Sequence, residues 1–264
     1  MTRIAFVGTG NMSAAIARSA AASAENELLL YNRTPEKAVA LARELHGRAV
    51  SLEEAATEAE LLFLGVTPQA LEQVLPRLRD ALAARETPLL LCTMAAAQPI
   101  RRYREALTNV HVLRFMPNTP IRIGKGMVLY TPDDTVTAAE EALFCAVISP
   151  GARLLKLREE QIDPITCVTG CSIAYNYLYI EALAKHAEAF GIPAETAFQI
   201  AAQSVAGAAE LALVSGKTPE ELRGEVCTPG GTSIEGVKYL QRNDLFGLVD
   251  GACEASLRRC EELK

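Results

Sequence analysis

The feature that most constrains this chain is a glycine turn between an apolar run and a helical stretch at its start. Residues 4–7 have the apolar character of a strand, and residues 12–22 are alanine-rich with helical spacing. Between them, Gly8 can take a tight bend, and Gly10 has no Cβ to keep a pyrophosphate away from the backbone. The first amides of the helix then point at the anion. This order predicts a dinucleotide-binding turn, with an ordinary tight connection as the alternative; Ser13 stands where a third Gly or Ala is usual.

The composition excludes several classes of function. The 264 residues, of which 50% are hydrophobic, suffice for one large or two modest domains. Acidic residues outnumber basic ones by 32 to 26, so the chain has no basic footprint for nucleic acid or an anionic membrane. A small molecule is therefore the expected partner.

Cysteine and histidine usage indicates a reduced protein without a metal site. The seven cysteines include no Cys-x-x-Cys pair, and none of the three histidines has a second ligand at metal-binding spacing. We expect reduced thiols and a cytoplasmic location. The chain enters a strand at once and has no apolar run of membrane-spanning length, so we expect neither a signal peptide nor a transmembrane helix.

A second strand and helix, over residues 28–31 and 35–45, complete a βαβ unit. The end of that strand discriminates between cofactors, because an acid there binds the ribose hydroxyls and repels a 2′-phosphate. This chain has Asn32, Arg33 and Thr34 instead. These neutral and basic groups predict NADPH, with NADH possible; the alternative is a solvated turn in which Arg33 has no role.

Later strand ends supply further candidates for cofactor contact. Residues 61–66 and 88–92 are continuous apolar runs typical of buried parallel strands, and open α/β sheets bind ligands outside the carboxyl ends of their strands. Residues 110–115 form another strand that runs into a two-proline corner, where Asn118 either contacts the nicotinamide or caps the corner. The candidate cofactor residues are Gly8, Thr9, Gly10, Asn11, Met12, Asn32, Arg33, Thr34, Gly65, Val66, Thr67, Pro68, Met94, Ala95, Ala96 and Asn118.

The pattern changes after about residue 157. Residues 126–130 and 152–155 look like the last strands, and residues 160–264 contain long helical segments without a convincing strand. We predict an α/β fold with a Rossmann-like dinucleotide-binding domain, residues 1–157, and an all-α domain, residues 158–264. The helices expected in the second domain cover residues 173–190, 194–214, 234–241 and 245–262, with a short one opened by Thr218-Pro219.

The helix over residues 173–190 carries apolar and aromatic residues on nearly every side, so we expect it to be buried. A small helical domain cannot cover such a helix alone, which predicts a homodimer through this domain. Two patches, residues 166–172 and 228–233, are expected to be non-helical. In the second, the amides of Gly230, Gly231, Thr232 and Ser233 form a cradle for a carboxylate, with a plain helix cap as the alternative.

Four motifs together resemble those of the pyrroline-5-carboxylate reductases, which perform the last step of proline synthesis. They are FVGTGNM at residues 6–12, FLGVTPQ at 63–69, RFMPNTP at 114–120 and VCTPGGT at 226–232. The third and fourth are more specific than the glycine turn, and the four span the whole chain in order. Two departures are Thr67, where the family commonly has Lys, and residues 169–175, where the family's Ser-Gly-Ser-Gly-Pro-Ala-Tyr is changed.

The resemblance implies reduction of 1-pyrroline-5-carboxylate to L-proline by hydride transfer from NADPH or NADH. A protonated imine is already an electrophile, so holding the two reactants in place is the main task and little acid–base machinery is needed. The resemblance implies that Gly230, Gly231, Thr232 and Ser233 bind substrate, and that the Ser233 hydroxyl is the catalytic group beside the imine nitrogen. It also implies a site shared between the two chains of a dimer.

Two other functions stay open at the level of the sequence. One is an NADP-dependent β-hydroxyacid dehydrogenase, for which Lys185 and Asn176 on a long helix would be the acid–base candidates. Their separation along the chain fits one helix face poorly, and the Pro-Gly-Gly-Thr turn is then unexplained. The other is a non-catalytic NADP-binding sensor, because a fold does not establish a function.

Overall fold

The computed structural model describes residues 1–263 and divides into two compact units. Unit 1 contains residues 1–170 and the C-terminal segment from Leu257, and unit 2 contains Cys171–Ser256. The assignment of residues 1–157 and 158–264 to a cofactor domain and a substrate domain stays a prediction.

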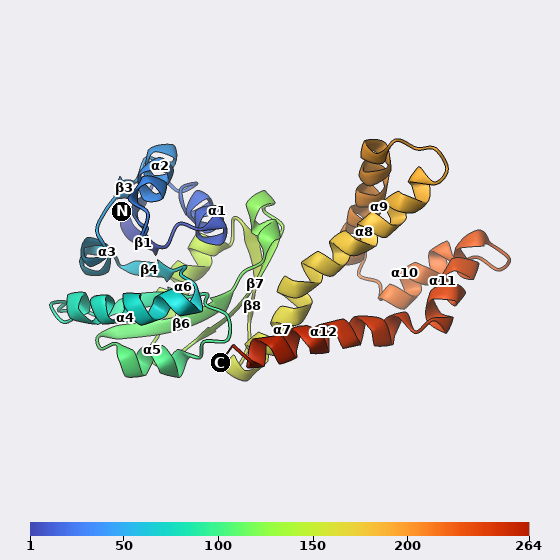
Figure 1. The fold of residues 1–264 in the computed structure, drawn as a ribbon. Helices are drawn as coiled ribbons and strands as arrows, with labels where there is room; N and C mark the ends of the chain where they lie inside the picture. Colours follow the sequence, from blue (N-terminus) through green and yellow to red (C-terminus); the bar gives the residue numbers. More distant parts are fainter. Residues whose placement is uncertain (264) are drawn as a thin grey trace. The chain divides into compact units, whose positions relative to one another are not determined.

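Unit 1 is built on one eight-stranded sheet in the order β3-β2-β1-β4-β5-β6-β7-β8 (Figure 1). The first six strands are parallel and follow the order of a dinucleotide-binding fold, whereas β7 is antiparallel to β6. The strands are β1 Thr2–Val7, β2 Asn26–Tyr31, β3 Arg48–Ala49, β4 Leu61–Leu64, β5 Leu89–Thr93, β6 Val110–Met116, β7 Gly126–Pro132 and β8 Ala152–Lys156. The predicted Rossmann-like fold is confirmed, and the sequence pattern missed only the two-residue strand β3.

Helices cover both faces of the sheet because successive side chains of each central strand point to opposite sides. Ile4 and Phe6 face one core, and Ala5 and Val7 face the other. The helices on the first face are α1 Asn11–Ala20, α2 Pro35–Leu45 and α6 Ala138–Ile148. Those on the second face are α3 Leu52–Glu58, α4 Pro68–Leu82 and α5 Ile100–Ala106. The strands are therefore buried on both sides, which explains why their sequences are continuous apolar runs.

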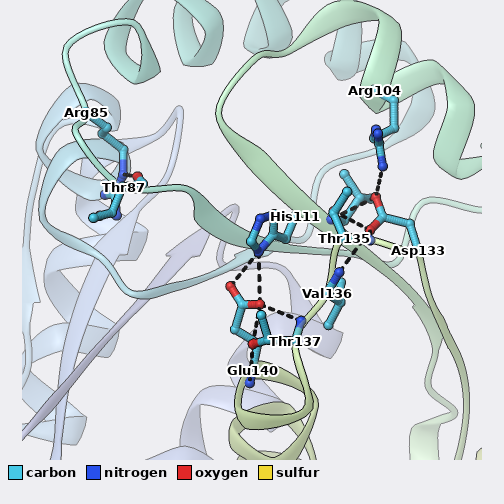
Figure 2. Close-up of polar contacts among 10 residues, drawn as sticks. Arg85, Thr87, Arg104, His111, Asp133, Thr135, Val136, Thr137 and Glu140 are labelled. Atoms are coloured by element: carbon cyan, nitrogen blue, oxygen red, sulfur yellow. Dashed lines mark hydrogen bonds and ion pairs between the residues drawn. The ribbon is translucent and has the colours of Figure 1, made fainter.

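Polar contacts hold the start of β6, the segment that follows β7 and the start of α6 together (Figure 2). His111 Nδ1 lies 2.8 and 2.9 Å from the two carboxylate oxygens of Glu140, which also accepts from the amide and hydroxyl of Thr137. Asp133 pairs with Arg104 at 2.9 Å and accepts from the Thr135 amide at 2.8 Å. These bonds tie the start of α6 to β6.

The remaining helices of the N-terminal part of unit 1 are short. The 3-10 helix η1 Thr119–Ile123 follows β6, and α7 Glu159–Thr166 continues through the π-helix η2 Cys167–Cys171 into α8. The expectation of a non-helical patch at residues 166–172 is therefore wrong. The Thr166 and Thr169 hydroxyls both donate to carbonyls four residues earlier, which satisfies them inside a helix rather than a loop.

Unit 2 is helical, as the sequence predicts. Its helices are α8 Ser172–Glu188, α9 Ala194–Val214, α10 Pro219–Val226, α11 Thr232–Arg242 and the greater part of α12 Leu245–Glu261. The buried residues of unit 2 are three alanines, Ala184, Ala197 and Ala201, where α8 packs on α9. Helix α8 is not covered within a single chain: Tyr177 is 61% and Leu178 68% exposed. The expectation that a second copy covers it stays a prediction.

Helix α9 is long and apolar enough to cross a membrane, whereas the sequence analysis expects no run of that kind. Within the chain, 11% of its apolar window is buried. One helix of this kind is weak evidence for a membrane span, because a helix covered by a protein surface has the same composition.

Candidate functional site

The glycine turn that follows β1 is held by close backbone packing. Gly8 has φ of +93°, which an L side chain rarely adopts, and a Cβ built on it lies 2.5 Å from the Gly65 carbonyl oxygen. A Cβ on Gly65 would in turn collide with the hydroxyl of Ser13. Ser13 is therefore tolerated at the third position of the motif because the end of β4 is a glycine.

The start of α1 is arranged for an anion. Gly10 is the N-cap residue, it supplies no side-chain cap, and a Cβ built on it meets nothing within 4 Å. The first intrahelical bond is made by the Ala14 amide to the Gly10 carbonyl at 2.9 Å, so the amides of residues 11–13 have no helical acceptor. The first turn contains no acidic residue. This open end of α1 fits a pyrophosphate.

A groove of about 360 Å³ lies outside the carboxyl ends of the parallel strands. It is lined by Gly10, Asn11, Met12, Ser13, Gly65, Val66, Thr67, Pro68, Met94, Ala95, Ala96, Met116 and Pro117. Ten of these were proposed from the sequence as cofactor residues. The sequence reasoning missed three of them, Ser13, Met116 and Pro117. The rule that selected the ends of β4 and β5 applies equally to the end of β6, which carries the last two.

The predicted 2′-phosphate residues lie at the end of β2, outside the residues that line this groove. Asn32 Oδ1 accepts from the Thr9 amide at 3.1 Å, and Asn32 Nδ2 donates to the Thr34 carbonyl at 3.0 Å. Thr34 is the N-cap residue of α2 but forms no side-chain cap bond. Arg33 is exposed and makes no ion pair or hydrogen bond within residues 1–263, so its guanidinium is free to bind a phosphate.

Asn118 is buried at the corner after β6, and both ends of its amide bind backbone. Its Nδ2 donates to the Thr169 carbonyl at 2.8 Å, and its Oδ1 accepts from the Met127 amide at 2.9 Å. Asn118 is the N-cap residue of η1 but forms no side-chain cap bond, so its amide joins the corner to Met127 and Thr169 instead of capping it. A contact with the nicotinamide stays a prediction.

The second candidate site is the turn before α11 in unit 2. Gly230 has φ of +75°, Gly231 is the N-cap residue, and the Gly231 amide donates to the Thr228 carbonyl at 2.9 Å. The following amides of α11 have no helical acceptor. Ser233 is exposed, and its hydroxyl makes no hydrogen bond in the part of the chain that the structure describes. The turn thus presents free donors and a free hydroxyl.

A metal centre and a reactive Cys92 are not found in the described residues. No cluster of three His, Cys, Asp or Glu side chains among residues 1–263 could hold a metal ion. The Cys92 thiol lies in the core, where burial raises its pKa well above the usual value and keeps it protonated. No disulfide joins the seven cysteines.

Comparison with known proteins identifies both parts of the chain. Residues 159–263 match the family model for pyrroline-5-carboxylate reductase dimerisation, and residues 3–87 match the model for coenzyme F420-dependent NADP oxidoreductases. Pyrroline-5-carboxylate reductase of Escherichia coli K12 is 32% identical over 99% of this chain and 98% of its own length. Pyrroline-5-carboxylate reductase 3 of Danio rerio is also 32% identical, over 99% of this chain and 91% of its own.

Solved structures agree with these matches. A pyrroline-5-carboxylate reductase from Coxiella burnetii superposes with a TM-score of 0.91 and 28% identity over 100% of this chain and 98% of its own. The fold is shared with the NADP-bound reductase of Plasmodium falciparum, with a TM-score of 0.86 and 22% identity over 99% and 98% of the two chains. The full-length similarity to the curated relatives places this chain in the pyrroline-5-carboxylate reductase family.

Proposed function

We propose that this chain reduces 1-pyrroline-5-carboxylate to L-proline with NADPH, and that NADH can replace NADPH. The observation that carries the proposal is the groove at the carboxyl ends of β1, β4, β5 and β6, whose lining includes ten residues selected for cofactor binding from the sequence. It lies in a chain that aligns along 99% of its length with reductases of this name.

The groove fits a dinucleotide. Gly10 leaves open the space that a Cβ would occupy, and the free amides of residues 11–13 donate to the pyrophosphate. When bound, the dihydronicotinamide supplies the hydride that the imine carbon accepts. Met94, Ala95 and Ala96 contribute small or unbranched side chains to the lining and so leave room for the cofactor.

The 2′-phosphate is assigned to the turn after β2. Arg33 is free of internal partners, and its planar guanidinium suits a phosphate group. Thr67 lines the groove in place of the family's usual Lys, so Arg33 is the cation on which phosphate recognition depends in this chain.

The substrate carboxylate is assigned to the turn Gly230, Gly231 and Thr232 at the start of α11, where the positive end of the helix dipole and the first amides of the helix favour an anion. The Gly231 amide is not one of the free donors expected from the sequence, because it is bonded to the Thr228 carbonyl. Ser233 is proposed as the catalytic group: its hydroxyl donates a hydrogen bond to the lone pair of the neutral imine nitrogen, polarises the C=N bond and passes on the proton that this nitrogen takes up as the carbon accepts the hydride. Orientation of the two reactants supplies the rest.

The assembly is proposed to be a homodimer through unit 2, in the cytoplasm. Helix α8 exposes Tyr177, Leu178 and Tyr179, and α9 exposes Phe198 and Leu211. Apolar side chains in such number need a cover, and the matched family model for this region is named for dimerisation.

A hydroxyacid dehydrogenase is not favoured. Lys185, the acid–base candidate for that reaction, pairs with Glu181 at 2.6 Å, and this hydrogen bond raises the pKa of the lysine. A lysine that acts as a base needs the opposite change.

The test measures the oxidation of NADPH by pyrroline-5-carboxylate as the loss of absorbance at 340 nm. The same assay with NADH compares the two cofactors, and assays of small 3-hydroxy acids with NADP⁺ measure the alternative reaction. We expect oxidation that depends on the imine and no turnover of the hydroxy acids. Binding of NADPH without imine turnover would refute the enzymatic proposal and leave the sensor, whereas hydroxy-acid turnover would establish the dehydrogenase.

A further inference from the structure

The amide of Asn32 lies between the two turns to which we assign the cofactor phosphates. It follows β2 directly and contacts the glycine turn after β1 on one side and the Arg33-Thr34 turn on the other. Its oxygen accepts from the Thr9 amide at 3.1 Å, and its nitrogen donates to the Thr34 carbonyl at 3.0 Å. Because one contact needs an acceptor and the other a donor, the two bonds fix the orientation of the amide.

The bond between the Thr9 amide and the Asn32 oxygen occupies groups that could otherwise contact the cofactor. The Thr9 amide is no longer available to a pyrophosphate, and one of the two lone pairs of the Asn32 oxygen is occupied. The neighbouring Gly8 amide is also taken, since it donates to the Tyr31 carbonyl at 2.8 Å. The glycine turn is therefore anchored to the end of β2 by two consecutive amides before any ligand binds.

The opposite side of the turn is fixed by backbone contacts, without a side-chain hydrogen bond. Gly8 lies against the Gly65 carbonyl, and the Gly65 amide donates to the Val7 carbonyl at 2.9 Å. Within the turn, the Thr9 hydroxyl is buried without a hydrogen-bond partner, so this side chain adds no polar anchor of its own. Asn32 is thus the side chain that holds the turn by hydrogen bonding.

We propose that Asn32 is a positioning residue that preorganises the pyrophosphate turn for either cofactor, rather than a residue that contacts the 2′-phosphate. This inference rests on the proposed function, and it assigns phosphate discrimination to Arg33 alone. Loss of the two Asn32 hydrogen bonds makes the turn less ordered. NADPH and NADH both bind this turn, so the affinities for both cofactors decrease together.

The test compares dissociation constants of NADPH and NADH for the full chain, measured by quenching of nucleotide fluorescence. Asn32→Ala is expected to weaken both by about five- to tenfold, the effect of one or two hydrogen bonds, with their ratio unchanged within about twofold. Asn32→Asp keeps an acceptor for the Thr9 amide but adds a negative charge, so it is expected to retain NADH binding and lose NADPH binding.

Hydrogen exchange of the Thr9 amide in the cofactor-free protein gives a second readout. We expect protection in the wild type and in Asn32→Asp, and fast exchange in Asn32→Ala. The matched control is Asn26→Ala, which removes an amide-to-backbone bond of 2.8 Å to Ala20 at the opposite end of β2. It is expected to change neither affinity.

The outcomes separate this inference from the proposed function. A selective loss of NADPH binding in Asn32→Ala would overturn the positioning role and make Asn32 a phosphate contact, while the function stands. Unchanged Thr9 exchange in Asn32→Ala would also overturn it. Failure of the wild type to bind either nucleotide would refute the proposed function itself.

Discussion

Unit 1 and unit 2 differ in how far a single chain completes them. In unit 1, the central strands are buried on both faces and the sheet carries two extended apolar cores. In unit 2, burial is confined to three alanines between α8 and α9, and large apolar side chains face outward. The two units have similarly apolar sequences, so the contrast concerns what covers them.

Apolar periodicity therefore indicates burial in the functional assembly, which need not be burial within the chain. The all-round apolar pattern of α8 correctly indicated a covered helix only if a second copy supplies the cover. Unit 1 is then expected to hold the cofactor by itself, whereas unit 2 is expected to depend on assembly.

The largest effect is expected from Leu178→Glu in α8, because a carboxylate at a residue that is 68% exposed in one chain would be buried without a partner in the dimer. We expect a monomer in light scattering and loss of nearly all turnover. Val39→Glu, at an exposed apolar residue of α2 in unit 1, is the matched control and should leave the assembly intact. A dimeric Leu178→Glu protein would remove this face from the interface.

Ser233→Ala is expected to lower kcat by about a hundredfold, the usual contribution of one proton-donating group, with the NADPH dissociation constant unchanged. Ser51→Ala is the control, because Ser51 also lies at a helix start but caps α3 through the Glu54 amide at 3.1 Å. It should cost about 1 kcal/mol of stability without changing kcat. An unaltered kcat in Ser233→Ala would refute the catalytic assignment.

Arg33→Ala is expected to weaken NADPH binding by about tenfold or more and to leave NADH binding nearly unchanged, since we propose that the guanidinium contacts the 2′-phosphate and no other part of the cofactor. Arg43→Ala removes the same charge from the far end of α2 and should affect neither nucleotide. Titrations that show equal losses for both nucleotides in Arg33→Ala would contradict the phosphate assignment.

The smallest effect concerns Glu140 at the edge of unit 1. Partial burial alone would raise the pKa of Glu140, but hydrogen bonds from Thr137 and His111 outweigh it and lower the pKa. A carboxyl with a lowered pKa in the folded state stabilises the protein above its unfolded pKa, and this stabilisation disappears as the pH falls through the folded pKa.

Glu140→Gln should therefore cost about 1 kcal/mol at neutral pH, and the difference from wild type should shrink as the pH falls from about 6 to about 3. Urea unfolding across this range measures it. Glu86→Gln, at an exposed residue with no ion pair in the described chain, is the control. A difference that grows toward acid pH would contradict the assigned direction.

Much of the fold could be predicted because its signals are local. The glycine turn, the continuous apolar strands and the capping boxes at Ser51 and Thr218 each depend on neighbouring residues. Two helical segments were missed although their contacts are also local. Helix α5 is short and lacks a strong apolar pattern, and residues 167–171 are small and hydroxyl-rich like a loop, whereas the Thr166 and Thr169 hydroxyls bind carbonyls four residues earlier and keep the path helical.

The candidate site could be predicted only where its position follows from sheet topology. Sheet topology located the groove, because the carboxyl ends of parallel strands share one edge. The bonds of Asn32 to Thr9 and of Asn118 to Thr169 join residues far apart in the sequence, and no periodicity encodes them. Sequence reasoning could therefore place both asparagines near the site without telling contact from positioning.

Hydride transfer to the imine carbon is tested most directly by the mass of the proline formed from pyrroline-5-carboxylate with NADPH that carries deuterium at both C4 positions. We expect L-proline with one deuterium at C5, formed in step with NADPH oxidation. Proline without deuterium, or oxidation of NADPH without proline, would contradict hydride transfer to the imine carbon.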